Sequence, residues 1–382
     1  MNHSVDAAVD GRIDQRIGHG ESHGLGGWYM AEVERKRSLL ERLDDDFVIC
    51  AEGYLFELER RGYVQAGSFV PEVVLDHPEA LAQLHREFMR AGSDIIEAFT
   101  YYGQREKLRL IGKEEVLEPL NRTAIRIARE VAAEAVGEQP LVAGNICNTN
   151  VFDPDEPGSP ATVRAMFDEC VGWAAEEGAD LIIAETYYYL EEAKQALAAI
   201  QRTGLPSVVT LALPASGTLR DGNSIADACK ILEDEGADVV GMNCYRGPST
   251  ALSAVAEIRG RVTGHVAALP VPYRTTDEHP TFFSLPDPGT DLAPNDRPFP
   301  IALDPLRCSR FEMARFARQV FDLGVRYLGV CCGGTPAHIR QIAEELGRTP
   351  PASEYSPDMS KHVFFGTDPS LSSINTEARD EF

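Results

Sequence analysis

Short apolar segments rich in β-branched residues alternate with longer amphipathic segments along most of this chain. The short segments have the length and composition of β-strands. Eight such strands are predicted, at residues 47–54, 94–102, 141–147, 180–186, 207–213, 238–244, 264–269 and 325–331.

The intervals between these strands carry apolar residues at helical spacing. Helices are predicted at residues 77–92, 120–137, 161–178, 190–204 and 336–347. Several of them end in glycine, which is favoured just beyond a helix C-terminus. Strands that alternate with helices are typical of a parallel sheet, and eight such units predict a (β/α)8 TIM barrel. A doubly wound open sheet is the alternative, but the GxGxxG phosphate fingerprint is absent after the first strand.

Neither end of the chain shows this alternation. The N-terminal segment is rich in Gly, His and charged residues, and the C-terminal segment is equally irregular. Chain ends of this kind are usually poorly ordered. We therefore expect a flexible N-terminal arm at 1–35, the barrel at 36–350 and a C-terminal arm or tail at 351–382.

The composition limits the partners and the compartment. The formal net charge is −24, which argues against nucleic acid and anionic membranes, because phosphate binding requires clustered Lys and Arg. No apolar run is long enough to cross a bilayer, and the N-terminus lacks the apolar core of a signal peptide. We expect a cytoplasmic protein, in which the eight cysteines are thiols that pack, react or bind metal.

Polar side chains and thiols follow directly after several predicted strands. Barrel enzymes carry their functional groups at the C-terminal ends of the strands. The candidates at this face are Glu52, Tyr101, Tyr102, Cys147, Asn148, Glu185, Asn243, Cys244, Cys331 and Cys332. Thiols from separate strands are therefore expected to converge.

Three converging thiolates would leave one position open on a tetrahedral Zn²⁺, as in catalytic zinc sites. Cys331 and Cys332 are adjacent, and neighbouring residues in a strand point to opposite faces. They can share an ion with Cys244 only if the chain leaves extended geometry, which the glycines that follow, Gly333 and Gly334, permit. The alternative is a set of buried apolar thiols, and Cys147 competes for the third ligand position.

Two cysteine motifs resemble those of a known family. GMNC at 241–244 and GVCCGG at 329–334 each close a predicted strand and look like the zinc motifs of the homocysteine S-methyltransferase family. The stretch 41–108 resembles the betaine–homocysteine branch of that family, and AET at 184–186 agrees with it. The similarity covers roughly residues 40–352.

This resemblance implies a ligand set and a substrate. It implies Zn²⁺ bound by Cys244, Cys331 and Cys332 rather than by Cys147. It also implies that the loop after the first strand and the acid after the fourth, namely Glu52, Gly53 and Glu185, hold the amino-acid end of homocysteine.

The chain departs from the betaine branch around the methyl donor. That branch usually reads GDGG where this chain has AEGY at 51–54, and Phe69 stands in the segment that typically supplies a tryptophan. Thr186 precedes a run of three tyrosines that begins at Tyr187. Aromatic faces attract quaternary ammonium and sulfonium groups, so we expect Phe69, Tyr102 and one of the run, Tyr187 first, to surround such a donor. The alternative for the run is a strand end with its hydroxyls in water.

Together these features predict a zinc-dependent methyltransferase that moves a methyl group from an onium donor, glycine betaine first, to the thiol of homocysteine, giving methionine. S-methylmethionine or dimethylsulfoniopropionate is the alternative donor in the same reaction. A module of a folate- or cobalamin-linked system would need a second catalytic domain, for which the residues beyond 352 are too few. A non-catalytic zinc- or thiol-binding protein is the alternative of another class. We also expect a homo-oligomer, dimer or tetramer.

Overall fold

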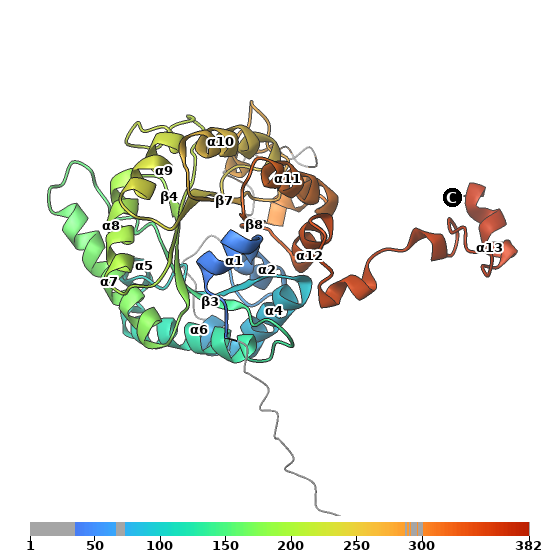
Figure 1. Ribbon diagram of the computed structural model, residues 1–382, viewed down its shortest axis with the longest axis horizontal. Coiled ribbons are helices and arrows are strands. Elements are labelled where there is room, and N and C mark those ends of the chain that lie inside the picture. Colours follow the sequence, from blue (N-terminus) through green and yellow to red (C-terminus); the bar gives the residue numbers. More distant parts are fainter. Residues whose placement is uncertain are drawn as a thin grey trace, which may run out of the picture. The chain divides into compact units, whose positions relative to one another are not determined.

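Eight parallel strands close into a barrel in the computed structural model (Figure 1). The structure describes residues 35–65, 73–286, 289, 291, 296 and 301–381. The strands are β1 (Val48–Ala51), β2 (Ile95–Glu97), β3 (Leu141–Cys147), β4 (Leu181–Tyr187), β5 (Ser207–Leu211), β6 (Val239–Asn243), β7 (His265–Leu269) and β8 (Tyr327–Val330). Each strand pairs in parallel with the next, and β8 pairs with β1. The predicted (β/α)8 TIM barrel is confirmed, and the open sheet is excluded.

Helices surround the barrel, and all five predicted helical segments are helical. The α-helices are α1 (Leu39–Asp45), α2 (Tyr54–Arg60), α3 (Val73–Asp76), α4 (Pro78–Ala91), α5 (Arg105–Leu110), α6 (Leu117–Ala132), α7 (Ser159–Glu176), α8 (Leu190–Gln201), α9 (Ile225–Asp234), α10 (Pro248–Arg261), α11 (Arg310–Asp322), α12 (Pro336–Glu345) and α13 (Ser373–Glu377). Short 3-10 helices are η1 (Glu114–Val116), η2 (Phe282–Ser284), η4 (Ile301–Leu306), η5 (Pro351–Tyr355), η6 (Met359–Lys361) and η7 (Ala378–Glu381).

Local sequence signals fix several helix ends. Ser38 and Ser309 cap α1 and α11, and in each case a glutamate three residues later returns a hydrogen bond to the cap backbone. Such capping boxes satisfy N–H groups that have no partner inside the helix. Gly92 ends α4 in the left-handed conformation at φ +104°, which glycine adopts without steric cost.

The apolar core has two parts, one inside the barrel and one between the barrel and its helices. Val48 and Cys50 point into the interior, whereas Ile49 and Ala51 face the helices. Both faces of each strand are therefore buried, which explains the continuous apolar runs in the sequence. Leu39 and Leu43 of α1 join the interior cluster, so α1 closes the N-terminal end of the barrel.

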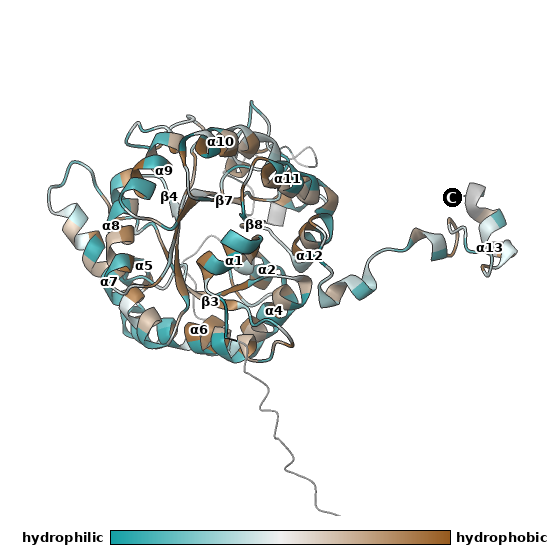
Figure 2. Cartoon of the chain, in the orientation of Figure 1, coloured by the Kyte–Doolittle hydropathy of each residue, from teal (hydrophilic) through white to brown (hydrophobic). Residues whose placement is uncertain are grey.

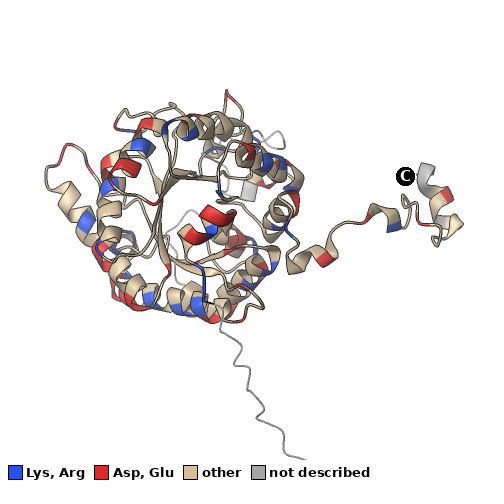
Figure 3. Cartoon of the chain, in the orientation of Figure 1, with Lys and Arg blue, Asp and Glu red and all other residues tan. Residues whose placement is uncertain are grey.

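The surface has the opposite character. Figure 2 shows the strands in apolar colours and the outer faces of the helices in polar ones, and Figure 3 places charges of both signs around the outer helices. All eight cysteines are free thiols. Among the described residues, none of the helices is long and apolar enough to cross a membrane.

The residues that follow the barrel belong to the same compact unit, which begins at Lys36. In this unit η5 contacts α4 and α12, and the Arg90 guanidinium lies 5.6 Å from the centroid of the Tyr355 ring. The division into arms at 1–35 and 351–382 around a barrel at 36–350 stays a prediction.

His85 on α4 gives the stability of the fold a pH dependence. Its ring is fully buried, and Nδ1 lies 3.1 Å from the Tyr54 hydroxyl. Burial lowers the pKa of His85 to about 3, whereas an unfolded histidine titrates near pH 6.5. Below that pH the unfolded chain therefore binds a proton that the folded chain does not, and the free energy of unfolding falls.

Between pH 7 and pH 5 we expect the free energy of unfolding of the wild type to fall by roughly 2 kcal/mol more than that of the His85→Gln variant. Urea unfolding at both pH values measures this difference. His77→Gln, which removes an exposed histidine at the start of the same helix, is the control and should follow the wild type. Identical pH dependence in the wild type and His85→Gln would contradict the assignment.

Candidate active site

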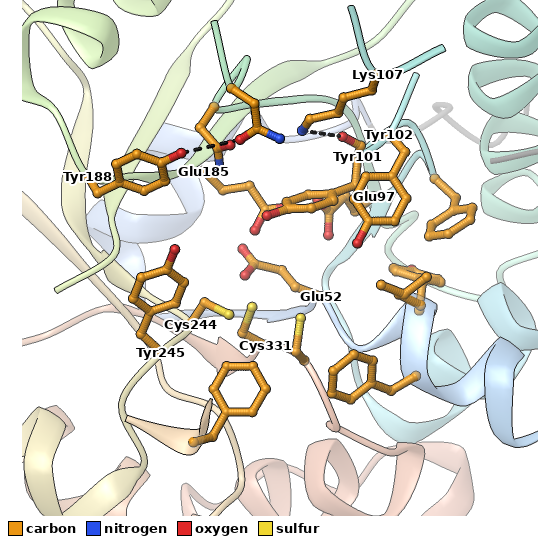
Figure 4. Close-up of a pocket in the computed structure, with 18 of the residues that line it drawn as sticks. Glu52, Glu97, Tyr101, Tyr102, Lys107, Glu185, Tyr188, Cys244, Tyr245 and Cys331 are labelled. Atoms are coloured by element: carbon orange, nitrogen blue, oxygen red, sulfur yellow. Dashed lines mark hydrogen bonds between the residues drawn. The ribbon is translucent and has the colours of Figure 1, made fainter. Parts of the chain in front are cut away.

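A pocket of about 240 Å³ lies at the C-terminal end of the barrel (Figure 4). Its walls come from the C-terminal ends of β2 and β4 and from residues that follow β1, β2, β3, β4, β6, β7 and β8, as expected for this fold. The structure brings most of the predicted site residues together here: Glu52, Tyr102, Glu185, Cys244, Cys331 and Cys332 line the pocket.

Three thiols form one cluster in this pocket. The Sγ atoms of Cys244, Cys331 and Cys332 all lie within 4.8 Å of one another. Cys244 and Cys331 are buried, and Cys332 is partly exposed. Hydrogen bonds with Cys331 and Cys332 lower the pKa of the Cys244 thiol. Cys147 belongs to a different contact, in which its Sγ lies 2.9 Å from Lys107 Nζ.

The backbone leaves extended geometry at both cysteine motifs. Cys244 and Tyr245 follow β6 with φ of +56° and +53°, a conformation that side chains other than glycine rarely adopt. Gly333 has φ +89°, and a Cβ there would lie 2.7 Å from the Tyr273 hydroxyl oxygen. Gly334 is needed for space instead, because its Cβ would lie 2.8 Å from Val330 Cγ1. Such unusual conformations persist only where the surrounding structure holds them.

Gly53, which follows β1, packs against the turn at Gly333 and Gly334 that follows Cys331 and Cys332. A Cβ at Gly53 would lie only 2.3 Å from the Gly334 carbonyl oxygen, so these two segments touch through their backbones. Gly53 itself does not line the pocket. Its close packing brings the neighbouring Glu52 beside the thiols, with Glu52, Glu185 and Cys331 also offering ligand atoms within 4.8 Å of one another.

Three buried carboxylates share the pocket, and two asparagines hold them. Asn243 Nδ2 donates to Glu185 Oε2 at 2.6 Å and to Glu52 Oε2 at 3.3 Å. Asn145 Nδ2 donates to Glu185 Oε1 at 2.7 Å and also to Glu97. Burial raises the pKa of all three acids, reinforced at Glu52 and Glu97 by the charge of Glu185 and at Glu185 by Cys332. Their ionised forms therefore require a cation nearby.

Glu97 is a pocket residue that the sequence analysis did not select. It is the last residue of β2 and lies two positions after the interior residue Ile95. Successive side chains of a strand alternate between its faces, so an acid two places beyond an interior residue also points inward. This alternation was the signal that could have identified it.

Aromatic rings form the other walls of the pocket. Tyr102 lies beside Tyr101, with ring centroids 5.1 Å apart. Further rings in the lining are Tyr54, Phe56, Phe99, Tyr188, Tyr245, Phe282 and Phe283. Phe69, the other predicted donor residue, lies outside the described residues.

The tyrosine run places Tyr188, and not Tyr187, in the pocket. Tyr187 is fully buried, and its ring packs edge-on against Phe167 of α7 with centroids 5.9 Å apart. The pairing of β4 with β5 is irregular between Ala184 and Tyr187, and Thr186 has φ +64°. This irregularity interrupts the alternation of side chains that would otherwise turn Tyr187 inward with Glu185.

The fold and the site together define a (β/α)8-barrel enzyme whose pocket combines clustered thiols, buried carboxylates and aromatic rings. The model of the homocysteine S-methyltransferase family matches residues 48–346. The chain therefore belongs to the homocysteine S-methyltransferase family and is a methyltransferase, and its curated relatives place it in the betaine–homocysteine S-methyltransferase-like branch.

Individual relatives cover most of the chain. Betaine–homocysteine S-methyltransferase 1 of Danio rerio is 36% identical over 352 residues, covering 88% of this chain and 82% of its own length. The protein of that name from Rattus norvegicus is 35% identical, covering 92% and 86%. S-methylmethionine–homocysteine S-methyltransferase BHMT2 of Pongo abelii is 34% identical, covering 84% and 85%.

A solved structure supports the fold. The crystal structure of the homocysteine methyltransferase MmuM from Escherichia coli, in its oxidised form, superposes with a TM-score of 0.62. It is 20% identical in sequence and covers 80% of this chain and 98% of its own.

Proposed function

We propose that the protein transfers a methyl group from an onium donor to the sulfur of homocysteine, and that Zn²⁺ held by Cys244, Cys331 and Cys332 activates this sulfur. The convergence of these three thiols beside buried carboxylates carries the proposal. It is supported by the relatives, whose names all specify homocysteine S-methyltransferases.

The three cysteine thiols are suitable ligands for zinc. Zinc binds cysteine sulfur at about 2.3 Å, and sulfur atoms around one tetrahedral ion must therefore lie within a few ångströms of one another. The three Sγ atoms meet this condition, and thiolates are the ligands that favour zinc over harder ions such as Mg²⁺. Three protein ligands would leave the fourth position for the substrate sulfur. When bound, Zn²⁺ lowers the pKa of a coordinated thiol and thus presents it as a thiolate.

The carboxylates suit the ammonium group of homocysteine. Glu52 Oε1 is buried and accepts no hydrogen bond among the described residues, so it can accept one from a substrate. Glu185 lies beside it, bridged by Asn243. A bound ammonium would favour the ionised forms of both acids, whose pKa values burial raises. With Gly53 shaping the turn, these residues orient the amino-acid end of homocysteine.

The aromatic walls suit a positively charged donor. Transfer forms a bond between the homocysteine sulfur and the methyl carbon, while the bond between that carbon and the onium atom breaks. The electron pair of the broken bond stays with the onium atom, so a neutral amine or sulfide leaves. Tyr102 and Tyr188 in the pocket, together with Phe69, are proposed to contact the cation before transfer.

Glycine betaine is the first candidate donor, and a sulfonium compound is the second. The relatives include enzymes named for betaine and for S-methylmethionine, both of which are onium compounds. The buried carboxylates and rings would have no role in a protein that only stores metal, so the non-catalytic alternative is not favoured. A cytoplasmic homo-oligomer remains the expected form of the enzyme.

We expect the zinc-loaded protein to produce methionine from homocysteine and at least one of glycine betaine, S-methylmethionine and dimethylsulfoniopropionate. Mass spectrometry of reactions with each donor, and with a methylated folate for comparison, measures the product. Methionine formed from the folate and from none of the onium compounds would contradict the proposed donor class.

Zinc content tests the ligand set separately. We expect about one Zn²⁺ per chain in the wild type. The variants Cys244→Ser, Cys331→Ser and Cys332→Ser should lose both the bound zinc and the ability to form methionine, because each removes one of three thiolates. Elemental analysis of the purified variants measures the metal. Cys229→Ser, a buried thiol on α9, is the matched control. Full zinc in a Cys331→Ser/Cys332→Ser double variant would overturn the assignment.

Glu185→Gln should raise the KM for homocysteine about tenfold or more, because a charge-assisted hydrogen bond to a buried ammonium contributes about 1.5–3 kcal/mol. Zinc content should not change. Glu192→Gln is the control, since Glu192 is equally buried, accepts hydrogen bonds from Thr149 and lies outside the pocket lining. Steady-state kinetics with varied homocysteine measures the effect, and an unchanged KM in Glu185→Gln would refute the role.

A further inference from the structure

Lys107 is a buried lysine that the proposed reaction has not used. It lies on α5, is 1% exposed, and is the only cationic side chain among the described residues that line the pocket. Its place in a charged helical segment, REKLRL, gave no sign of this role in the sequence. A lysine is almost never fully buried unless its ammonium is paired.

The contacts of the Lys107 ammonium are with neutral groups. Nζ lies 2.9 Å from Cys147 Sγ and 3.3 Å from the Tyr101 carbonyl oxygen. Burial raises the pKa of Cys147 to about 12, so this partner is a thiol and not a thiolate at neutral pH. Among the described residues, no carboxylate lies within 4.0 Å of Nζ. The ammonium therefore has no carboxylate in direct contact to compensate for its burial. The buried Glu192 interacts with it at longer range, since burial raises the pKa of Glu192 and the charge of Lys107 partly offsets this rise.

Lys107 lies beside the aromatic rings of the pocket and away from the cluster of Cys244, Cys331 and Cys332. Nζ lies 4.9 Å from the centroid of Tyr101 and 5.5 Å from that of Tyr102. In Figure 4 it lies on one side of the pocket, and Cys244 and Cys331 lie on the other, with the labelled carboxylates between them. The acids proposed to hold homocysteine, Glu52 and Glu185, accept hydrogen bonds from Asn243 at the end of β6.

We infer that Lys107 binds a carboxylate of the methyl donor, and that the enzyme therefore selects onium carboxylates over onium cations that have no acid group. The inference rests on the proposed function and deepens it. The aromatic rings attract the onium end of such a zwitterion, and Lys107 attracts its acid end. A cation without a carboxylate would meet the Lys107 ammonium with no compensating attraction, so the same residue also discriminates against it.

Donor selectivity of the wild-type enzyme is the first test. Two matched pairs differ in the acid group: glycine betaine against choline, and dimethylsulfoniopropionate against trimethylsulfonium. We expect kcat/KM to be at least about tenfold higher for the carboxylate in each pair, as for a charge-assisted hydrogen bond. Equal or higher kcat/KM for choline and trimethylsulfonium would overturn the inference and leave the proposed function intact. No methionine from any of the four, or from S-methylmethionine, would overturn both.

The Lys107→Met variant is the second test, because it keeps the length of the side chain and removes its charge. We expect a rise of about tenfold or more in the KM for glycine betaine, an unchanged KM for homocysteine, and a smaller preference for glycine betaine over choline. Lys107→Arg, which keeps the charge, should retain part of that preference.

Arg109→Met is the matched control, since it removes a positive charge from an exposed position of the same helix. It should behave as the wild type. If Lys107 were only structural, Lys107→Met would lower kcat/KM equally for donors with and without an acid, which would overturn the inference. A raised KM for homocysteine with an unchanged donor preference would assign Lys107 to the other substrate and overturn it as well. If Lys107→Met does not fold, the wild-type pairs decide.

Discussion

The site depends on the burial of like-charged acidic groups in one place. Three thiols and three carboxylates line a single pocket of a (β/α)8 barrel, and burial raises the pKa of the carboxylates. Such groups ionise together only when cations neutralise them. A metal at the thiols, a substrate ammonium at Glu52 and Glu185, and an onium group at the rings would supply this positive charge. The same constraint makes the pocket unsuited to a phosphate or another purely anionic ligand.

The backbone conformation at the strand ends determines where the side chains of the site point. Asn150, Thr186, Cys244 and Tyr245 all have positive φ without being glycine, and all four lie close to the C-terminal end of a strand at the pocket side of the barrel. The surrounding hydrogen bonds hold these conformations, for example from the Thr186 amide to Asn243 Oδ1 at 3.0 Å. Conformational strain is thus concentrated where side chains must point to a common centre, and the rest of the barrel compensates for it.

Sequence patterns predicted the features that follow simple periodicities. The eight strands and five of the helices were predicted because burial of a strand on both faces, or of a helix on one face, leaves a regular apolar pattern. The helices α10 and α11, which are longer than α8 and α12, were not among them. The position of each motif at a strand end predicted that thiols converge at one face of the barrel, and the family resemblance selected Cys244, Cys331 and Cys332 over Cys147. The inward position of Tyr188 was not predictable, because the irregularity at Thr186 changes the alternation without any glycine to mark it. Lys107 was missed because its charge, which suggests exposure on a helix, gives no sign of its burial.

The depth of the site within the barrel follows from the alternation of inward- and outward-pointing side chains along each strand. Cys50, Ile95, Ala143 and Ile183 belong to the apolar interior, which α1 covers at its N-terminal end. The residues two places further along these strands are Glu52, Glu97, Asn145 and Glu185. In all four strands the next inward-pointing residue after the apolar one is polar. The apolar core therefore ends in a single polar layer. That layer is the bottom of the pocket, and the thiols and aromatic rings form its walls. The boundary of the apolar core therefore determines the depth at which a charged substrate can bind.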